Sequence, residues 1–283
     1  MIAAAALDCW LKSRAGDNCV AISGDGMDDL PSFDLSGQVA LVTGAARGLG
    51  RSIALALAHA GADMALGLRS PEADGGVAAA VEAMGRRALR LDMDVTDLPA
   101  SRQAIDRTVA TMGRLDILVN NAGGGIGGMA LDVTEADFGA VMDLNVRSAF
   151  FLSQHAAKAM IRAGRGGRIV NLSSQAALVA LPGEASYCIA KAALSHMTRC
   201  LAVEWGQHGI TVNAVAPTFI ETPGTAAALS DPAFRADTLE RIAALHRIGQ
   251  PRDVSGAVVF LASPAASLVT GHTLVVDGGW TAR

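Results

Sequence analysis

The chain has 283 residues, a hydrophobic fraction of 51% and a formal net charge of −4 at pH 7. The negative balance argues against nucleic acid as a partner, and neither a basic run nor an apolar stretch of the roughly 20 residues needed to span a bilayer indicates a membrane. The four cysteines and six histidines lack the spacing of a metal site or a disulfide framework, so we expect a soluble protein of the reducing cytoplasm that requires no metal.

The first 34 residues differ in composition from the rest of the chain. They begin with an apolar run that lacks the basic region of a secretory signal, and the stretch 16–31 is rich in glycine and aspartate. This composition predicts a poorly ordered extension over 1–34. Either the natural protein begins at Met27 or the extension is genuine, and the intact mass of natively expressed protein distinguishes the two.

A glycine-rich turn follows the first apolar run that favours a β-strand, 38–42. The turn reads TGAARGLG over 43–50 and leads directly into a helical pattern at 51–59. Such a turn lets the backbone approach a pyrophosphate closely, while the helix N-terminus offers free N–H groups and a partial positive charge. The spacing G-x-x-x-G-x-G therefore predicts a nucleotide site, and a turn that only packs the helix on the strand is the less favoured alternative.

The end of the second predicted strand, 63–67, bears on the choice of nucleotide. In dinucleotide-binding folds an acidic residue at this point binds the ribose 2′-hydroxyl of NAD, whereas a nearby arginine accommodates the 2′-phosphate of NADP. Here the strand leads into Arg69, and no carboxylate occupies the position. Asp63 lies at the other end of the strand, where we expect a solvated residue.

Two arginines favour a bound phosphate. Arg47 lies within the glycine turn at a helix N-terminus, where a cation is unfavourable unless an anion neutralises it. Together with Arg69 it could clamp a 2′-phosphate through charge-assisted hydrogen bonds, the alternative being that both arginines are solvated. We therefore predict NADP(H) as the preferred cofactor, with NAD(H) as the alternative.

Polar motifs follow two further apolar strands. The run 115–119 ends in NNAG over 120–123, and the run 168–172 ends in two serines. Because ligands bind at the carboxyl ends of the strands in open α/β sheets, we expect both motifs to line one site.

A tyrosine and a lysine lie four residues apart in the next helical pattern. Tyr187 and Lys191 would share one face of that helix, and Ser174 lies thirteen positions upstream of the tyrosine. Alone, such a pair is a weak indication, since a tyrosine and a lysine often meet at this spacing as a solvated pair. A lysine ammonium beside a phenol can nevertheless make the tyrosine a proton donor.

Together with Asn145 and NAVAP over 213–217, these motifs resemble those of the short-chain dehydrogenases/reductases in order and spacing. The resemblance runs from about residue 35 to the C-terminus, and 3-oxoacyl-ACP reductases and sugar or polyol dehydrogenases are similar members. It implies an α/β fold, a single Rossmann-like domain over 35–283 with a doubly wound parallel sheet of about seven strands and helices on both faces. A substrate lid is expected over about 219–247.

The resemblance implies an oxidoreductase that interconverts a ketone and a secondary alcohol by hydride transfer. Tyr187 would be the acid and base, and its pKa, near about 10 when unperturbed, would be lowered by the Lys191 ammonium. By resemblance, Lys191 also binds the nicotinamide ribose, Ser174 holds the carbonyl oxygen, and Asn145 positions a water that links Lys191 to solvent. Ser173 is the rival of Ser174, and only the family spacing selects between them. The less favoured alternative is a non-catalytic dinucleotide sensor, a class that tends to lose the tyrosine or the lysine.

The resemblance also assigns the residues that contact the cofactor. Asp94 is among them, although it could instead cap a helix, a role that suits Asp97 better. Two departures from the family pattern, Ala177 and Thr218 in place of glycines, concern the shapes of loops. The assigned residues are Gly44, Arg47, Gly48, Leu49, Gly50, Arg69, Asp94, Val95, Asn121, Ala122, Gly123, Tyr187, Lys191, Pro217, Ile220 and Thr222.

A small carbonyl or alcohol substrate is expected to enter between 123–128, 175–185 and the lid, whose two short helical patterns are separated at 230–232. Glu184 and Glu221 could bind a hydroxyl-rich substrate, although solvated loop carboxylates are slightly favoured. Polyol or sugar oxidation with NAD therefore remains the alternative to NADP(H)-dependent ketone reduction.

The family usually forms tetramers, so we expect a homotetramer. The contacts would be made by the two long helices predicted at 135–163 and 185–208, and by the last strand with its preceding helix. An apolar last strand, 274–276, would otherwise leave a sheet edge exposed.

Overall fold

The computed structural model describes residues 30–282, and most of the predicted extension over 1–34, with Met27, lies outside them. The described chain contains one parallel sheet of seven strands in the order β3-β2-β1-β4-β5-β6-β7, which confirms the predicted fold class. The strands are β1 (Val39–Thr43), β2 (Asp63–Leu68), β3 (Ala88–Asp92), β4 (Ile117–Asn120), β5 (Gly167–Leu172), β6 (Ile210–Pro217) and β7 (Thr273–Val276).

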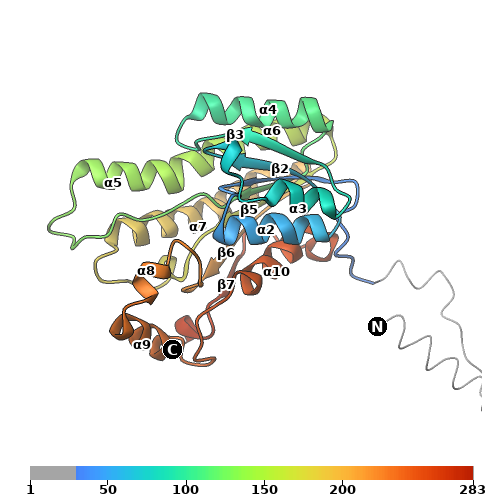
Figure 1. Ribbon diagram of the computed structural model, residues 1–283. Coiled ribbons are helices and arrows are strands. Elements are labelled where there is room, and N and C mark those ends of the chain that lie inside the picture. The colour runs from blue at the N-terminus through green and yellow to red at the C-terminus, as the bar shows by residue number, and fades with distance from the viewer. Residues whose placement is uncertain (1–29, 283) are drawn as a thin grey trace, which may run out of the picture. The chain divides into compact units, whose positions relative to one another are not determined.

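Helices cover both faces of the sheet (Figure 1). Each face has its own apolar cluster, one built with α2, α3 and α10 and the other with α4, α6 and α7. Because both faces are buried, the central strands are almost continuously apolar rather than alternating. The helices are α2 (Gly48–His59), α3 (Val77–Ala83), α4 (Leu98–Met112), α5 (Glu135–Met142), α6 (Ser148–Ala163), α7 (Ala185–Trp205), α8 (Ala226–Leu229), α9 (Pro232–Arg241) and α10 (Pro251–Ala262).

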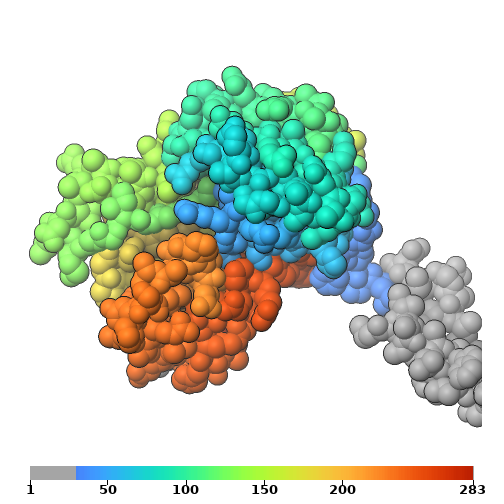
Figure 2. Space-filling view, viewed as in Figure 1, coloured from blue at the N-terminus to red at the C-terminus, as the bar shows by residue number. Residues whose placement is uncertain are grey.

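Short helical turns complete the chain, and two segments stand out from its body. The segment with α5 (light green) and the segment with α8 and α9 (orange) project on the same side of the molecule (Figure 2). No helix within residues 30–282 is long and apolar enough to cross a membrane. The turns are 3-10 helices at Pro71–Ala73, Gln175–Ala177, Gly206–His208, Pro264–Ala266 and Trp280–Ala282, and a π-helix at Asp143–Arg147.

The order of the strands reverses at β1, which lies between β2 and β4. A crevice for a ligand forms at such a point, beyond the carboxyl ends of the strands. The Thr43 hydroxyl ties the two ends together, because it accepts hydrogen bonds from the backbone N–H groups of Asn121 and Ala122, both at 2.9 Å. The glycine turn and the NNAG motif are therefore held against each other.

Local sequence rules explain where several elements begin. Asp97 caps α4 by accepting a hydrogen bond from the backbone of Ala100, as expected. Asp231 caps α9 in the same way and produces the predicted break between α8 and α9. The expectation that Asp63 is merely solvated was wrong: its carboxylate accepts hydrogen bonds from the backbone and the guanidinium of Arg87, at 2.8 and 2.7 Å, and so pairs the starts of β2 and β3.

A buried polar network joins the sheet to the helices on one face. The Asn120 amide donates to the Ser153 hydroxyl of α6 (2.9 Å) and to the Asn171 side-chain oxygen of β5 (2.8 Å). The Asn171 amide in turn donates to the Thr198 hydroxyl of α7 (2.9 Å). All four side chains are buried, so each bond also satisfies a group that water cannot reach.

Because of this network, we expect Asn171→Leu to lower the free energy of unfolding substantially. This substitution leaves the Asn120 amide and the Thr198 hydroxyl short of a partner, and each unsatisfied buried group costs about 1–3 kcal/mol. We expect a loss of at least about 2 kcal/mol of unfolding free energy, measured by urea denaturation. The control is Gln207→Ala, at an exposed side chain, which should change stability by less than about 0.5 kcal/mol. Equal effects of the two substitutions would contradict the role of the network.

Candidate active site

Tyr187 and Lys191 lie in the first turns of α7, and their side chains share one face of the helix as predicted. The Lys191 ammonium lies 5.4 Å from the centroid of the Tyr187 ring. Only 3% of Lys191 is exposed, and its Nζ donates a hydrogen bond of 2.8 Å to the carbonyl of Leu172, the last residue of β5. Burial lowers the pKa of Lys191 to about 8.

The expected lowering of the Tyr187 pKa is not found. The pKa of the phenol is raised to about 12, chiefly by burial; a hydrogen bond with Ser174 opposes the rise, and the charge of Glu184 contributes to it. The Lys191 ammonium donates its hydrogen bond to the Leu172 carbonyl rather than to the phenol. The protein's own groups thus keep Tyr187 protonated at neutral pH, in the form that donates a proton.

The structure gives the two adjacent serines different roles. The Ser173 hydroxyl is bonded to the Ser195 hydroxyl (2.7 Å) and donates to the Lys191 carbonyl (3.2 Å), so it packs α7 against β5. The Ser174 hydroxyl faces the phenol, donates to the side-chain oxygen of Gln175 (2.8 Å) and accepts from the backbone of Ala176 (3.1 Å). Sequence reasoning missed Gln175, a buried side chain that orients Ser174, because no motif or periodicity marks it.

Asn145 lies in a π-helical turn, so the predicted continuous helix over 135–163 was wrong at this point. Its side-chain amide donates to the carbonyls of Val141 (2.9 Å) and Gly124 (2.7 Å). The first bond lies within the helix, and the second fastens the helix to the loop after β4. Single-turn π-helices often occur at functional sites.

The absence of a side chain at Gly123 lets the side chains of Asn145 and Lys191 lie next to the same point of the backbone. A Cβ atom at Gly123 would lie 2.8 Å from the Asn145 side-chain oxygen and 3.1 Å from the Lys191 ammonium. Both groups therefore occupy the space that a side chain would fill. The arrangement is compatible with a water between Asn145 and Lys191, and that relay stays a prediction.

The glycine turn leaves its backbone open to a ligand. Gly44 and Gly48 have φ angles of +66° and +56°, a conformation that other residues rarely adopt. A Cβ at Gly50 would collide with the Gly44 carbonyl and lie 2.6 Å from the Asn121 amide, and a Cβ at Gly48 would lie 3.5 Å from Thr222. The turn thus fits a pyrophosphate: its backbone can be approached closely, and the first amides of α2 have no acceptor within the helix.

The charged groups around the glycine turn are consistent with binding of the 2′-phosphate that NADP carries and NAD lacks. Arg47 is exposed at the N-cap of α2 and makes no capping hydrogen bond. Arg69 is exposed directly after β2, where no carboxylate is present, and within residues 30–282 neither guanidinium makes a hydrogen bond or ion pair. Asp94 forms its own turn with Thr96, which chiefly lowers its pKa, with a smaller contribution from the charge of Arg69. Val95 is buried beside it.

The loop after β6 completes the site. Pro217 ends the strand, Ile220 is buried and pairs with Gly249, and Thr222 is hydrogen-bonded to Thr225. Thr218 stands where the family usually has glycine. Its φ is negative, so the turn accommodates a threonine without backbone strain. Its buried hydroxyl finds no hydrogen-bond partner among residues 30–282.

The two carboxylates considered for substrate binding, those of Glu184 and Glu221, differ in their exposure to solvent. Glu221 is exposed and accepts a hydrogen bond from the Gln250 amide (2.6 Å), which agrees with the solvated interpretation. For Glu184 that interpretation was wrong, because its side chain is half-buried at the start of α7 and burial raises its pKa.

The structure therefore gathers most predicted residues at one edge of the sheet. Asn145, Ser174, Tyr187 and Lys191 lie around the ends of β4 and β5, while the glycine turn and Thr222 meet beyond β1 and β6. Arg69, Asp94 and Val95 lie further along the edge, beyond β2 and β3. No group of three or more metal-ligating side chains occurs within residues 30–282.

A glycine turn at a strand-order reversal, beside a half-buried tyrosine, a buried lysine and a buried serine, defines a dinucleotide-dependent oxidoreductase. Comparison with known proteins agrees: a family model described as Enoyl-(Acyl carrier protein) reductase matches residues 44–281. The chain belongs to the short-chain dehydrogenase/reductase family, whose members act on CH–OH groups with NAD(P).

Relatives cover nearly the whole described chain. The 2-dehydro-3-deoxy-D-gluconate 5-dehydrogenase of Escherichia coli is 43% identical over 254 residues, covering 90% of this chain and 99% of its own. The galactitol 2-dehydrogenase of Rhizobium johnstonii is 43% identical over 257 residues, covering 88% and 97%. A solved gluconate 5-dehydrogenase from Burkholderia cenocepacia, in complex with NADP and tartrate, is 36% identical with a TM-score of 0.85, covering 89% and 98%.

Two glycine-to-alanine substitutions, one in the glycine turn and one in α10, should have opposite effects on the free energy of unfolding. Gly50→Ala places a Cβ against backbone and should cost about 1–3 kcal/mol. Gly256→Ala, in α10 with no atom within 4 Å of the added Cβ, should stabilise by about 0.5–1 kcal/mol because alanine favours the helix. Urea denaturation of both variants measures this, and stabilisation by Gly50→Ala would contradict the tight turn.

Proposed function

We propose that the protein is an NADP(H)-dependent oxidoreductase that interconverts a ketone and a secondary alcohol on a hydroxyl-rich substrate. The observation that carries the proposal is the convergence of Ser174, Tyr187, Lys191 and Asn145 beside an open glycine turn. We further propose that residues 35–283 form a single catalytic domain preceded by an extension.

The arginines support NADP(H) over NAD(H). Arg47 and Arg69 stand at the two places where a 2′-phosphate would be neutralised, and neither is paired with a carboxylate in the described chain. The Burkholderia cenocepacia relative was solved with NADP. When bound, the cofactor supplies or accepts the hydride.

The chain's own residues handle the proton. Tyr187, protonated because burial raises its pKa to about 12, donates its proton to the carbonyl oxygen in reduction and becomes a phenolate. In oxidation the phenolate form accepts the proton of the alcohol, so the phenol must first lose its proton to solvent. The single Ser174 hydroxyl proton, which is donated to the Gln175 side-chain oxygen in the structure, turns to the same substrate oxygen when substrate binds. Lys191 holds a positive charge within 5.4 Å of the phenol ring and, with Asn145, opens a route for proton exchange with solvent.

Relatives and the neighbouring segments support a sugar-like substrate. The three relatives described above are named for a dehydrodeoxygluconate, galactitol and gluconate, all hydroxyl-rich compounds. We propose that residues 219–247 close over the site as a lid. Its helices rest on an apolar cluster in which the Phe219 ring meets Phe234 edge-on at 5.3 Å and Trp280 at 5.8 Å.

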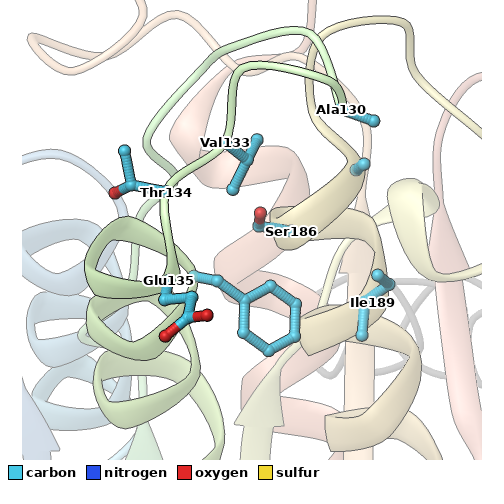
Figure 3. A pocket seen from close by; sticks show the side chains of 8 residues that line it. Ala130, Val133, Thr134, Glu135, Ser186 and Ile189 are labelled. Carbon is cyan, nitrogen blue, oxygen red and sulfur yellow. The ribbon is translucent and has the colours of Figure 1, made fainter.

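We propose a homotetramer in the cytoplasm, where its nicotinamide reactant is available. Exposed apolar side chains on the expected contact helices support this: 39% of Phe138, 50% of Ile189 and 85% of Val203 are accessible. A pocket of about 380 Å³ opens between the starts of α5 and α7, with Thr134 and Glu135 on one side and Ile189 on the other (Figure 3). Light scattering tests the assembly, and a monomer would refute it.

Replacing the proton donor tests the catalytic assignment. Tyr187→Phe removes only the hydroxyl, so we expect turnover of polyols with NADP⁺ to fall by about 10²–10⁴-fold. The dissociation constant for NADPH, followed by nicotinamide fluorescence, should change little. Retention of wild-type turnover would contradict the assignment.

Reversing the charge after β2 tests the cofactor preference. Arg69→Asp should weaken NADPH binding by at least about tenfold, because a carboxylate repels the 2′-phosphate, and should leave NADH binding equal or tighter. Arg107→Asp, an equal change of charge at an exposed position of α4, serves as the control and should alter neither. Unchanged relative affinities in Arg69→Asp would count against NADP(H).

A further inference from the structure

Glu184 occupies a position beside the catalytic tyrosine that neither the mechanism nor the fold uses. It directly precedes α7, and its carboxylate lies over the glycine run that follows β4. A Cβ at Gly125 would lie 2.9 Å from Glu184 Oε2 and 3.3 Å from the Cβ of Tyr187. A Cβ at Gly127 would lie 3.3 Å from Glu184 Oε1. The missing side chains of the glycines therefore leave room for a carboxylate next to the phenol.

Backbone hydrogen bonds hold the chain on both sides of Glu184. The Gly128 N–H donates to the Gly183 carbonyl (2.8 Å), which fastens the glycine run to the start of α7. The Glu184 carbonyl accepts from the Cys188 N–H (2.9 Å) as part of the first helical turn. Glu184 thus lies on rigid elements, as a residue that recognises a ligand should.

No group of the described chain uses the carboxylate. Neither oxygen accepts a hydrogen bond or forms an ion pair within residues 30–282, although the side chain is half-buried. A carboxylate has several acceptor positions, and leaving them empty in a partly buried place is costly. The cost is visible in two pKa values: burial raises that of Glu184, and the charge of Glu184 raises that of Tyr187. A stabilising role in the fold does not account for this placement, whereas acceptance of ligand hydroxyls does.

The charges of the lid argue against a negatively charged ligand. Arg241 donates to Asp237 (2.7 Å) and lies over the Trp280 ring, and Arg247 donates to Asp253 (2.6 Å). Two of the three lid arginines are therefore already paired with carboxylates, which leaves Arg235. A substrate carboxylate near Glu184 would meet a like charge without a dedicated cation beside it.

We propose that Glu184 is a substrate-binding residue that accepts hydrogen bonds from hydroxyl groups next to the reacting carbon and so selects neutral polyols and their ketoses over sugar acids. The inference rests on the proposed function and deepens it. It separates two classes of relative, since galactitol is neutral and gluconate carries a carboxylate.

Steady-state kinetics with NADP⁺ tests the proposal. The probes are galactitol and D-threitol as neutral polyols and D-gluconate as the acid. Wild-type enzyme should show a higher kcat/KM for a neutral polyol than for gluconate. Glu184→Gln keeps the shape and removes the charge, so the gluconate-to-polyol ratio of kcat/KM should rise by at least about tenfold, the equivalent of about 1.4 kcal/mol. Glu184→Ala should raise the KM for the polyol more than it lowers kcat.

The controls separate recognition from folding and from cofactor binding. Glu204→Gln, an exposed carboxylate on the same helix, should leave the ratio unchanged. The NADPH dissociation constant of each variant should equal that of the wild type. Should Glu184→Gln fail to fold, competition between polyol and gluconate for the wild-type enzyme loaded with NADPH replaces it, with tighter binding of the polyol expected.

Three results would overturn the proposal. They are a wild-type enzyme that prefers gluconate, a ratio unmoved by Glu184→Gln, and turnover only of ketones that carry no further hydroxyl. In the third case the enzyme remains a dehydrogenase, so the proposed reaction survives while the role of Glu184 does not. Failure of the proposed function would differ, since the wild-type protein would then neither bind NADPH nor turn over any probe.

Discussion

The hydrogen bond from the Lys191 ammonium to the Leu172 carbonyl is the constraint on which the site depends. It joins a buried charge on α7 to the last residue of β5, so the helix cannot shift along the sheet without leaving that charge unsatisfied. The same anchorage brings Tyr187 close to Ser174, two residues past the end of the strand. Removal from water also lowers the pKa of Lys191 to about 8 and raises that of Tyr187 to about 12.

Glycines, which have no side chain, shape this site as much as its polar side chains do. Gly50 and Gly44 let the backbone of the first turn come close to a pyrophosphate, and Gly123 leaves space that Asn145 and Lys191 share. Gly125 does the same for Glu184 and Tyr187. A Cβ atom at any of these glycines would fill the space that the neighbouring groups occupy. The glycines therefore determine which polar groups can come close together. A site built in this way can hold both a carboxylate and a buried ammonium near one phenol.

In the role proposed for Glu184, proton transfer and substrate choice are coupled through this one side chain. Its charge raises the pKa of Tyr187, which favours the protonated phenol required for ketone reduction, and its free oxygens suit hydroxyl donors on the substrate. A ligand that hydrogen-bonds the carboxylate would partly screen this charge. The recognition of a hydroxyl-rich substrate and the readiness of the phenol to exchange its proton are therefore linked by one side chain.

The sequence by itself determined the fold class and the strand ends, because apolar runs, glycine turns and helix caps such as Asp97 and Asp231 act through local backbone rules. It also placed Tyr187 and Lys191 on one face, since helical spacing is a local property. Only the tertiary structure decided that Glu184 is half-buried, that Gln175 orients Ser174 and that Asn145 opens a π-helical turn. These outcomes, like the pKa values of Tyr187 and Lys191, depend on burial and on partners distant in the chain, which no local pattern encodes.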